Sequence, residues 1–131
     1  MKKVLFLKIN NKILGNKGEE YTARYLMTRG YEILERNYLI KGSEIDIIAR
    51  KNNEIHFVEV KTRTHDFYGS PAEAVDYYKR KALIHGAKYY LMKHFEFADM
   101  ICSFDISEVY IKHRLLFNKI IKYIENAFEL E

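Results

Sequence analysis

The sequence predicts a mixed α/β (α+β) domain in which helices flank a small mixed sheet, in the order α-β-β-β-α-β. Three observations predict this fold class. An amphipathic stripe after residue 15 is typical of a helix, and a second helix-start signal follows residue 69. Between them lie three short runs in which polar and apolar residues alternate, typical of strands joined by tight turns. These runs cover residues 31–38, 44–50 and 55–63.

The chain has 131 residues, of which 48% are hydrophobic and 31% charged, so it is long enough for one domain with its own core. We expect residues 1–14 to be a basic lead-in, frayed or forming a short added strand, and residues 15–131 to be the single domain. No apolar run has the length of a signal peptide core or of a membrane span. The single cysteine, Cys102, excludes an internal disulfide and favours a reducing compartment. We therefore expect a cytoplasmic protein without a membrane partner.

The first helix is expected to begin at Asn16 as N-cap and to end at Gly30 as C-cap. Ala23 and Leu26 lie four and seven residues after Glu19, on the same side of the helix, and these two apolar residues must face the core. Glu19 therefore begins the buried stripe and does not belong to the solvent face.

The three strands place acidic residues among apolar neighbours. In the second strand, one face is expected to carry Glu44, Asp46 and Ile48, and the other Ile45, Ile47 and Ala49. In the third strand, one face carries Phe57, Glu59, Lys61 and Arg63. The turn at residues 51–54 joins these two strands as a hairpin, which brings Asp46 and Glu59 to neighbouring positions of the sheet.

The second helix is expected to begin at Ser70, with Pro71 at its first position and Glu73 completing a capping box, and to run to about His94. Its periodicity places Lys79 at the edge of the packed face.

The remainder of the chain returns to the sheet. A fourth strand is expected at residues 100–106, and residues 109–124 are expected to hold one or two further strands or a short helix. Phe128, in the tail, is expected to dock on the body of the domain.

Two carboxylates at neighbouring sheet positions repel each other unless a cation or a proton lies between them. Asp46 and Glu59 are therefore candidate ligands for Mg²⁺ or Mn²⁺, which prefer carboxylate oxygens, waters and phosphate oxygens. Lys61, about 7 Å from Glu59 along the strand, could orient a water or stabilise charge on a phosphate. Glu19 could contact the metal, and Lys79 could reach a phosphate.

Each of these residues also has a plainer interpretation. A Glu-x-Lys pair on a strand is usually a solvated surface pair that contributes under about 1 kcal/mol. Glu19 alone could complement a helix dipole, and Lys79 alone could be a surface lysine. The five histidines have no zinc-like spacing with cysteine and are expected to be structural or surface residues.

The chain resembles the bacterial YraN family of small endonuclease-like proteins over about residues 15–128. The residues that carry the resemblance are Gly15-Asn-Lys-Gly18-Glu19, Gly30-Tyr31-Glu-Ile-Leu-Glu-Arg36-Asn37-Tyr38, Glu44-Ile-Asp46-Ile-Ile-Ala49, Phe57-Val-Glu59-Val-Lys61-Thr-Arg63, Ala74-Val75, Lys79, Phe104-Asp105-Ile106 and Ile124-Glu-Asn-Ala-Phe128. That family is similar in turn to the PD-(D/E)xK nucleases, particularly the archaeal Holliday-junction resolvases.

The resemblance implies a restriction-endonuclease-like αβββαβ core. It implies Asp46 and Glu59 as metal ligands, Lys61 as the catalytic lysine, and Glu19 and Lys79 as catalytic residues from the two helices. The chain departs from the family pattern at Ser43, where glycine is more usual, and at Ser103, where arginine is more usual. Neither departure replaces an implied ligand.

A metal-dependent nuclease acting on DNA, branched or damaged, is the function that these observations favour. Arg63 and Lys79 are then expected to contact the nucleic acid. The net charge of +4 and pI of about 9.0 are compatible with such a partner. The alternatives are a catalytically inactive nucleic-acid-binding accessory protein with the same fold, and a protein-interaction domain. A homodimer is a further hypothesis, because enzymes that cut both strands or resolve junctions usually present two active sites and two-fold homodimers are the commonest oligomers.

Overall fold

The structure is a computed structural model that describes residues 2–64, 77–112 and 115–129, with side chains described from residue 11 on, except those of residues 64 and 115–118. The elements, in chain order, are α1 (Lys2–Thr28), β1 (Glu32–Ile40), β2 (Ser43–Lys51), β3 (Glu54–Thr64), α2 (Tyr77–Lys93), the 3-10 helix η2 (Phe95–Phe97), β4 (Ile101–Lys112) and β5 (Leu115–Phe128). The predicted mixed α+β class and αβββαβ order are confirmed, and β5 is added after them.

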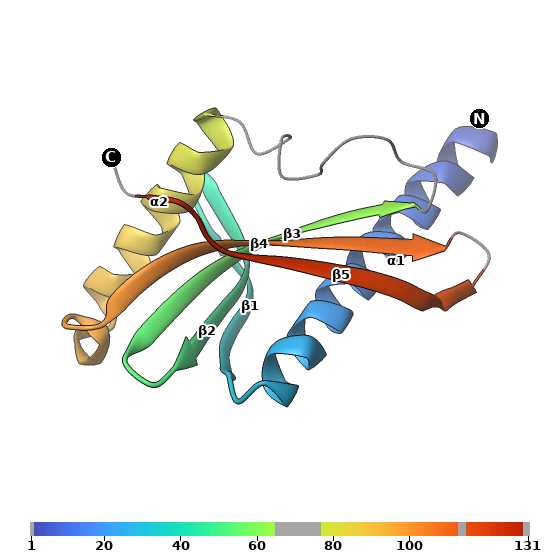
Figure 1. Cartoon of the computed structure of the whole chain (residues 1–131). Coiled ribbons are helices and arrows are strands. Elements are labelled where there is room, and N and C mark those ends of the chain that lie inside the picture. Colours follow the sequence, from blue (N-terminus) through green and yellow to red (C-terminus); the bar gives the residue numbers. More distant parts are fainter. Residues whose placement is uncertain (1, 65–76, 113–114, 130–131) are drawn as a thin grey trace.

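The five strands form one mixed sheet in the order β1-β2-β3-β4-β5 (Figure 1). β3 pairs in parallel with β4, and every other neighbouring pair is antiparallel. A parallel pair needs a crossover connection, which here contains α2. β3, at the centre of the sheet, is therefore held on both edges along much of its length.

Two apolar clusters separate the sheet from the helices α1 and α2, whose places are drawn in Figure 1. Leu83, Ala87 and Tyr90 of α2 pack with sheet residues such as Phe57 in one cluster. Ala23 and Leu26 of α1 pack with others, including Val58, in the second. Phe57 and Val58 are consecutive in β3, so α2 and α1 cover opposite faces of the strand.

α1 lies unusually close to β3 at Gly18. A side chain at this position would collide with the Thr62 hydroxyl. One turn further on, the Thr22 hydroxyl donates to the Gly18 carbonyl at 2.8 Å and lies 2.8 Å from the hydroxyl of Ser107 in β4. This close approach brings Glu19, the residue after Gly18, beside β3.

The predicted start of the first helix is wrong. α1 does not begin at Asn16 but runs from Lys2 to Thr28, so residues 2–14 are helical and form neither a strand nor a frayed lead-in. They contain no proline and several good helix formers, so an N-cap residue at position 16 does not stop the helix from extending backward. The predicted end is confirmed: Gly30 has φ +87° and its amide donates to the Met27 carbonyl at 3.1 Å.

The predicted face pattern of β2 is also wrong at one position. Ile45 and Ile48 both pack in the cluster under α2, so the alternation is interrupted between them. The pairing of β2 with β3 begins only at Ile47 and Val58, and Asp46 uses its side chain to accept the Val60 amide. The strand therefore departs from regular pleating at Asp46.

The C-terminal part of the fold is a long hairpin. The fourth strand runs to Lys112, well beyond the predicted residue 106. β5 occupies most of residues 109–124, for which the sequence predicts one or two strands or a short helix. Phe128 docks as predicted, with its ring stacked 5.0 Å from that of Phe104. The predicted helix start at Ser70, Pro71 and Glu73 lies outside the described residues. No helix in the described ranges is long and apolar enough to cross a membrane.

Candidate metal centre

A cleft of about 490 Å³ opens between the middle of α1, the first half of β2 at Asp46 and the second half of β3. Its lining includes Glu19, Asp46, Glu59, Lys61 and Arg63. Five of the six residues that the sequence singled out therefore line one cleft, although they come from three elements. The sixth, Lys79 of α2, reaches the same site through Glu59.

Glu59 is the buried centre of the site. Its residue is 3% exposed, so the alternative of a solvated surface pair with Lys61 does not hold. One carboxylate oxygen, Oε1, lies 3.4 Å from Lys61 Nζ and 3.3 Å from Lys79 Nζ. The other, Oε2, is buried and has no hydrogen-bond partner among the described residues. A buried carboxylate oxygen left in this way is costly unless something binds it.

Asp46 lies beside Glu59 and is fixed by the backbone of β3. Its Oδ2 accepts the Val60 amide at 2.8 Å. Burial, followed by the negative charges of Glu59 and Glu19, raises the pKa of Asp46 to about 7, although the Val60 amide and Lys79 act in the opposite direction. The fold thus holds a carboxylate where its ionised form is unfavourable.

Glu19 shows the same effect more weakly. Burial raises its pKa, the charges of Glu44 and Glu59 add to the rise, and Arg36 opposes it. The Arg36 guanidinium is engaged by Glu20 at 2.9 Å on the outer side of α1. Glu19 therefore faces the other acids of the cleft, as the buried stripe of its helix predicts.

The donor set fits a hard divalent cation. Mg²⁺ usually takes one or two carboxylates and completes its octahedron with waters and substrate oxygens. Glu59 Oε2 and the Asp46 carboxylate would supply the protein ligands, and Glu19, which lines the same cleft, would bind a water of the ion. The three carboxylates do not converge on a single point within 4.8 Å, as a direct three-ligand site would require. A bound cation would relieve the repulsion that raises the Asp46 pKa.

The unfavourable ionisation of the buried Asp46 predicts that the stability of the metal-free protein depends on pH. Because the folded pKa of about 7 exceeds the ordinary value of 3.8, the metal-free protein loses stability as the pH rises from about 4 to 7. Asp46→Asn removes the charge, and its amide oxygen can still accept the Val60 amide. We expect the variant to unfold with the same free energy as the natural protein near pH 4 and to be more stable at pH 8. One pKa unit is worth about 1.4 kcal/mol, so the gain is about 1–4 kcal/mol.

Urea denaturation of both proteins at the two pH values measures this difference. Adding Mg²⁺ at pH 8 should then stabilise the natural protein and leave Asp46→Asn unchanged. A variant that is less stable than the natural protein at pH 8 would show that Asp46 is a favourable structural acid.

Sequence reasoning missed a second polar cluster, centred on Asp105 in β4. Asp105 is 1% exposed and accepts hydrogen bonds from His56, Ser103 and Tyr123 and from the backbone of Asn126. Its partners lie on β3, β4 and β5, so no local pattern connects them. The signal available was an aspartate between the two apolar residues Phe104 and Ile106.

The fold and the cleft together define a class: a small αβββαβ domain whose central strand carries an acid and a lysine into a cleft lined by two further acids. The chain belongs to the uncharacterised protein family UPF0102, which it matches over residues 18–109, confirming the resemblance to the YraN family.

Curated relatives span almost the entire chain. A UPF0102 protein of Caldanaerobacter subterraneus subsp. tengcongensis is 43% identical over 121 residues, covering 92% of this chain and 98% of the relative. A UPF0102 protein of Clostridioides difficile is 44% identical over 120 residues, with 92% and 100% covered. One of Geobacter metallireducens is 40% identical over 124 residues, with 95% and 98% covered.

Proposed function

We propose that this protein is a metal-dependent nuclease that hydrolyses DNA phosphodiester bonds in the cleft between α1 and β3. The observation that carries the proposal is the state of Glu59: a buried carboxylate with two lysines on one oxygen and no hydrogen-bond partner on the other. A structural ion pair would satisfy both oxygens. A ligand for a Mg²⁺ or Mn²⁺ ion needs one of them kept open.

Asp46 and Glu59 would hold the metal, which supplies Lewis-acid activation of a phosphodiester oxygen. Lys61 lines the cleft with its side chain 18% exposed, so its ammonium is partly shielded from water beside Glu59. From there it stabilises negative charge that develops on the phosphate, or orients the attacking water. Glu19 binds and orients a water on the other side of the cleft.

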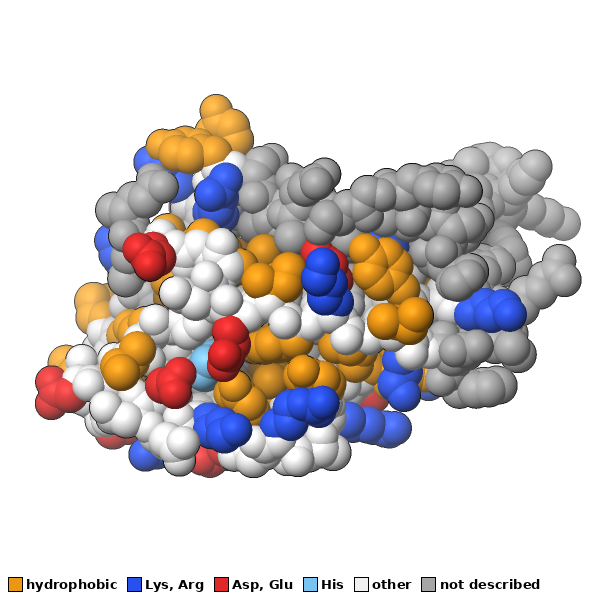
Figure 2. All heavy atoms as spheres, in the orientation of Figure 1, with side chains coloured by type: hydrophobic (Ala, Val, Ile, Leu, Met, Phe, Trp, Pro, Cys, Tyr) orange, Lys and Arg blue, Asp and Glu red, His pale blue; other side chains and the backbone are white. Residues whose placement is uncertain are grey.

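Lys79 acts chiefly by holding the side chain of Glu59 in position. Its ion pair with Glu59 fixes the side chain of that ligand from α2, and its own side chain, 41% exposed, can still approach a phosphate. Arg63 lines the outer part of the cleft, where its guanidinium can bind a neighbouring phosphate of the strand. On the face drawn in Figure 2, Lys and Arg side chains are spread among acidic ones and do not form one continuous band.

The sequence resemblance to junction resolvases favours branched DNA as substrate, and we propose a homodimer whose two clefts would cut two strands. The lone cysteine, Cys102, is in keeping with action in the cytoplasm, where such a substrate occurs.

The test is a cleavage assay on end-labelled duplex, flap and four-way-junction DNA, each with Mg²⁺, with Mn²⁺ and with a chelator. We expect cleavage of at least one branched substrate that needs the metal and disappears in the chelator. Salt-sensitive DNA binding that persists in the chelator, with no cleavage in either metal, would instead support the inactive accessory protein. Absence of DNA affinity at low salt would contradict both functions.

A further inference from the structure

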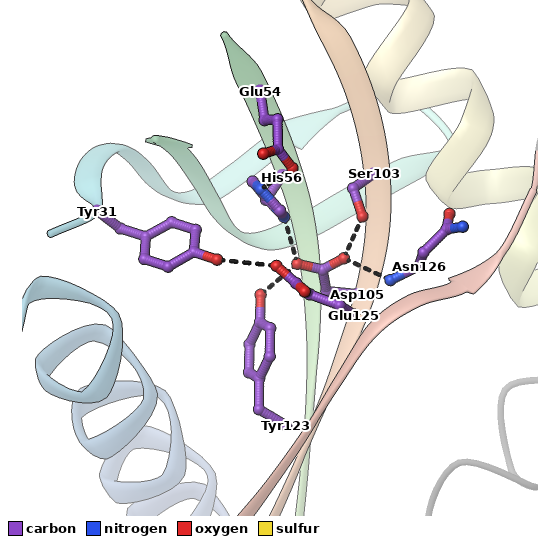
Figure 3. Close-up of polar contacts among 8 residues, drawn as sticks. All are labelled: Tyr31, Glu54, His56, Ser103, Asp105, Tyr123, Glu125 and Asn126. Carbon is purple, nitrogen blue, oxygen red and sulfur yellow. Dashed lines mark hydrogen bonds and ion pairs between the residues drawn. The ribbon is translucent and has the colours of Figure 1, made fainter. Parts of the chain in front are cut away.

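A buried carboxylate, Asp105, organises a cluster of polar residues from β3, β4 and β5 (Figure 3). Tyr123 donates to its Oδ2 at 2.5 Å, and Ser103 and the Asn126 amide donate to its Oδ1 at 2.6 and 3.0 Å. Burial raises the pKa of Asp105, but the hydrogen bonds, that of His56 foremost, outweigh burial and hold the pKa below its usual value. Asp105 is therefore an ionised carboxylate, and both of its oxygens accept hydrogen bonds from named donors.

His56 points one ring nitrogen at this acceptor and the other away from it. Its Nδ1 lies 2.6 Å from Asp105 Oδ2, so Nδ1 carries the proton of that hydrogen bond. Nε2 then projects to the opposite side of the ring. It is buried, in a residue only 1% exposed, and has no hydrogen-bond partner among the described residues. The T-shaped contact with the Tyr31 ring, 5.1 Å between centroids, fixes the plane of the imidazole.

Two carboxylates lie close to this imidazole. Glu54 begins β3 and places Oε1 3.4 Å from His56 Nε2. Glu125 comes from β5, and its Oε1 accepts the Tyr31 hydroxyl at 3.0 Å. One ligating atom from each of the three residues lies within 4.8 Å of the other two. Figure 3 shows the Glu54 carboxylate beside the imidazole and the Glu125 carboxylate next to that of Asp105.

We propose that Glu54, His56 and Glu125 form a second metal site, which takes a first-row transition dication such as Zn²⁺. The chemistry of the ligands selects the class of ion: an imidazole nitrogen suits Zn²⁺ and its neighbours in the series, whereas Mg²⁺ prefers oxygen alone. Two ligand atoms bound about 2.1 Å from a tetrahedral ion stand about 3.4 Å apart. The Nε2 to Glu54 Oε1 distance already has this value.

Asp105 supplies what a metal-binding histidine needs behind it. A carboxylate that accepts the Nδ1 proton fixes the tautomer, orients the ring and leaves the Nε2 lone pair for the ion. The Tyr31 hydroxyl orients the second proposed ligand, Glu125, by donating a hydrogen bond to its carboxylate. In the metal-free protein, burial lowers the pKa of His56 but Asp105, Glu54 and Glu125 raise it more. An ion bound at Nε2 would replace a proton there.

This site is distinct from the cleft and does not depend on the nuclease proposal. His56 and Glu59 are three residues apart in β3 and face opposite sides of the sheet, as the odd spacing dictates. The ion would tie the start of β3 to the end of β5, two strands that β4 separates. Three protein ligands leave one tetrahedral position for water, at a place where Glu125 is exposed.

The experiment is a Zn²⁺ titration of metal-stripped, tag-free protein against a chromophoric chelator, with Co²⁺ substitution to record the visible spectrum of the bound ion. The variants are Glu54→Gln, Glu125→Gln and the double variant, because these side chains lie at the rim and keep their shape. His56 and Asp105 are left intact so that the buried network stays folded. Glu96→Gln, an exposed acid of η2, and Glu59→Gln, in the cleft, serve as controls.

We expect the natural protein and both controls to hold one Zn²⁺ with the same affinity at this site. Each single variant should bind that ion at least about tenfold more weakly, and the double variant should lose it together with its Co²⁺ spectrum. Equal Zn²⁺ affinity in the natural protein and the folded double variant would overturn the proposal. So would a natural protein that takes up no Zn²⁺ in competition with the chelator.

Discussion

Replacing Lys61 by alanine should lower the rate of metal-dependent DNA cleavage by at least about a hundredfold. Lys61 is the ammonium that lines the cleft beside the proposed ligand Glu59. Stabilisation of charge that appears only in the transition state affects the rate more than substrate affinity. We therefore expect DNA binding to weaken only slightly, and single-turnover cleavage at saturating DNA to show nearly the whole loss.

Lys88→Ala is the matched control, because Lys88 is an exposed lysine on α2 and does not line the cleft. It should cleave at the natural rate. Lys61→Ala loses one of two lysines beside a buried carboxylate, so its thermal unfolding is measured alongside. A folded Lys61→Ala protein that cleaves as fast as Lys88→Ala would remove Lys61 from the mechanism.

Replacing Asp105 by alanine should reduce the free energy of unfolding by about 3–5 kcal/mol. The change leaves the hydroxyls of Ser103 and Tyr123 and the Asn126 amide without their acceptor, and His56 without its counter-charge. Each group left unsatisfied in a buried position costs about 1–3 kcal/mol, which relaxation and water entry reduce.

Urea denaturation at neutral pH measures this loss, and Asp99→Ala, an exposed aspartate in the turn before β4, is the control that should change little. A loss below about 1 kcal/mol for Asp105→Ala would show that the cluster contributes little to stability. The Zn²⁺ titration is separate from this measurement, because it uses variants that leave Asp105 in place.

The parts of the fold that local patterns encode were predictable. The hairpin of β2 and β3 follows from alternation on either side of residues 51–54, where Asn52 takes the positive φ of +54° that such a turn needs. The end of α1 follows from Gly30. The position of Glu19 followed from a stripe that Leu26, fully buried, confirms.

The features that the sequence did not predict correctly have physical causes that a local sequence pattern does not reveal. An N-cap residue such as Asn16 permits a helix start but does not impose one, because the preceding residues are equally able to be helical. The break in alternation at Asp46 arises from a tertiary hydrogen bond to Val60. The Asp105 cluster joins residues up to 49 positions apart, as His56 and Asp105 are.

For the candidate site, the sequence indicated which residues share a strand face but not how deeply they lie. The Glu-x-Lys spacing alone is typical of a surface pair, whereas Glu59 lies in the interior. Lys79 from α2 contacts the same oxygen of Glu59 as Lys61. Burial and charge convergence come from the packing of α1 and α2 against the sheet, which is a property of the whole fold.

The most direct measurement of the central proposal is the anomalous diffraction of crystals soaked in Mn²⁺. A Mn²⁺ peak in the cleft, within about 2.2 Å of oxygens of both Asp46 and Glu59, is the predicted result. The same soak of Glu59→Gln crystals should lose the peak. A cleft without Mn²⁺ in the natural protein, or Mn²⁺ bound only at Glu54, His56 and Glu125, would contradict the assignment of the cleft as the nuclease centre.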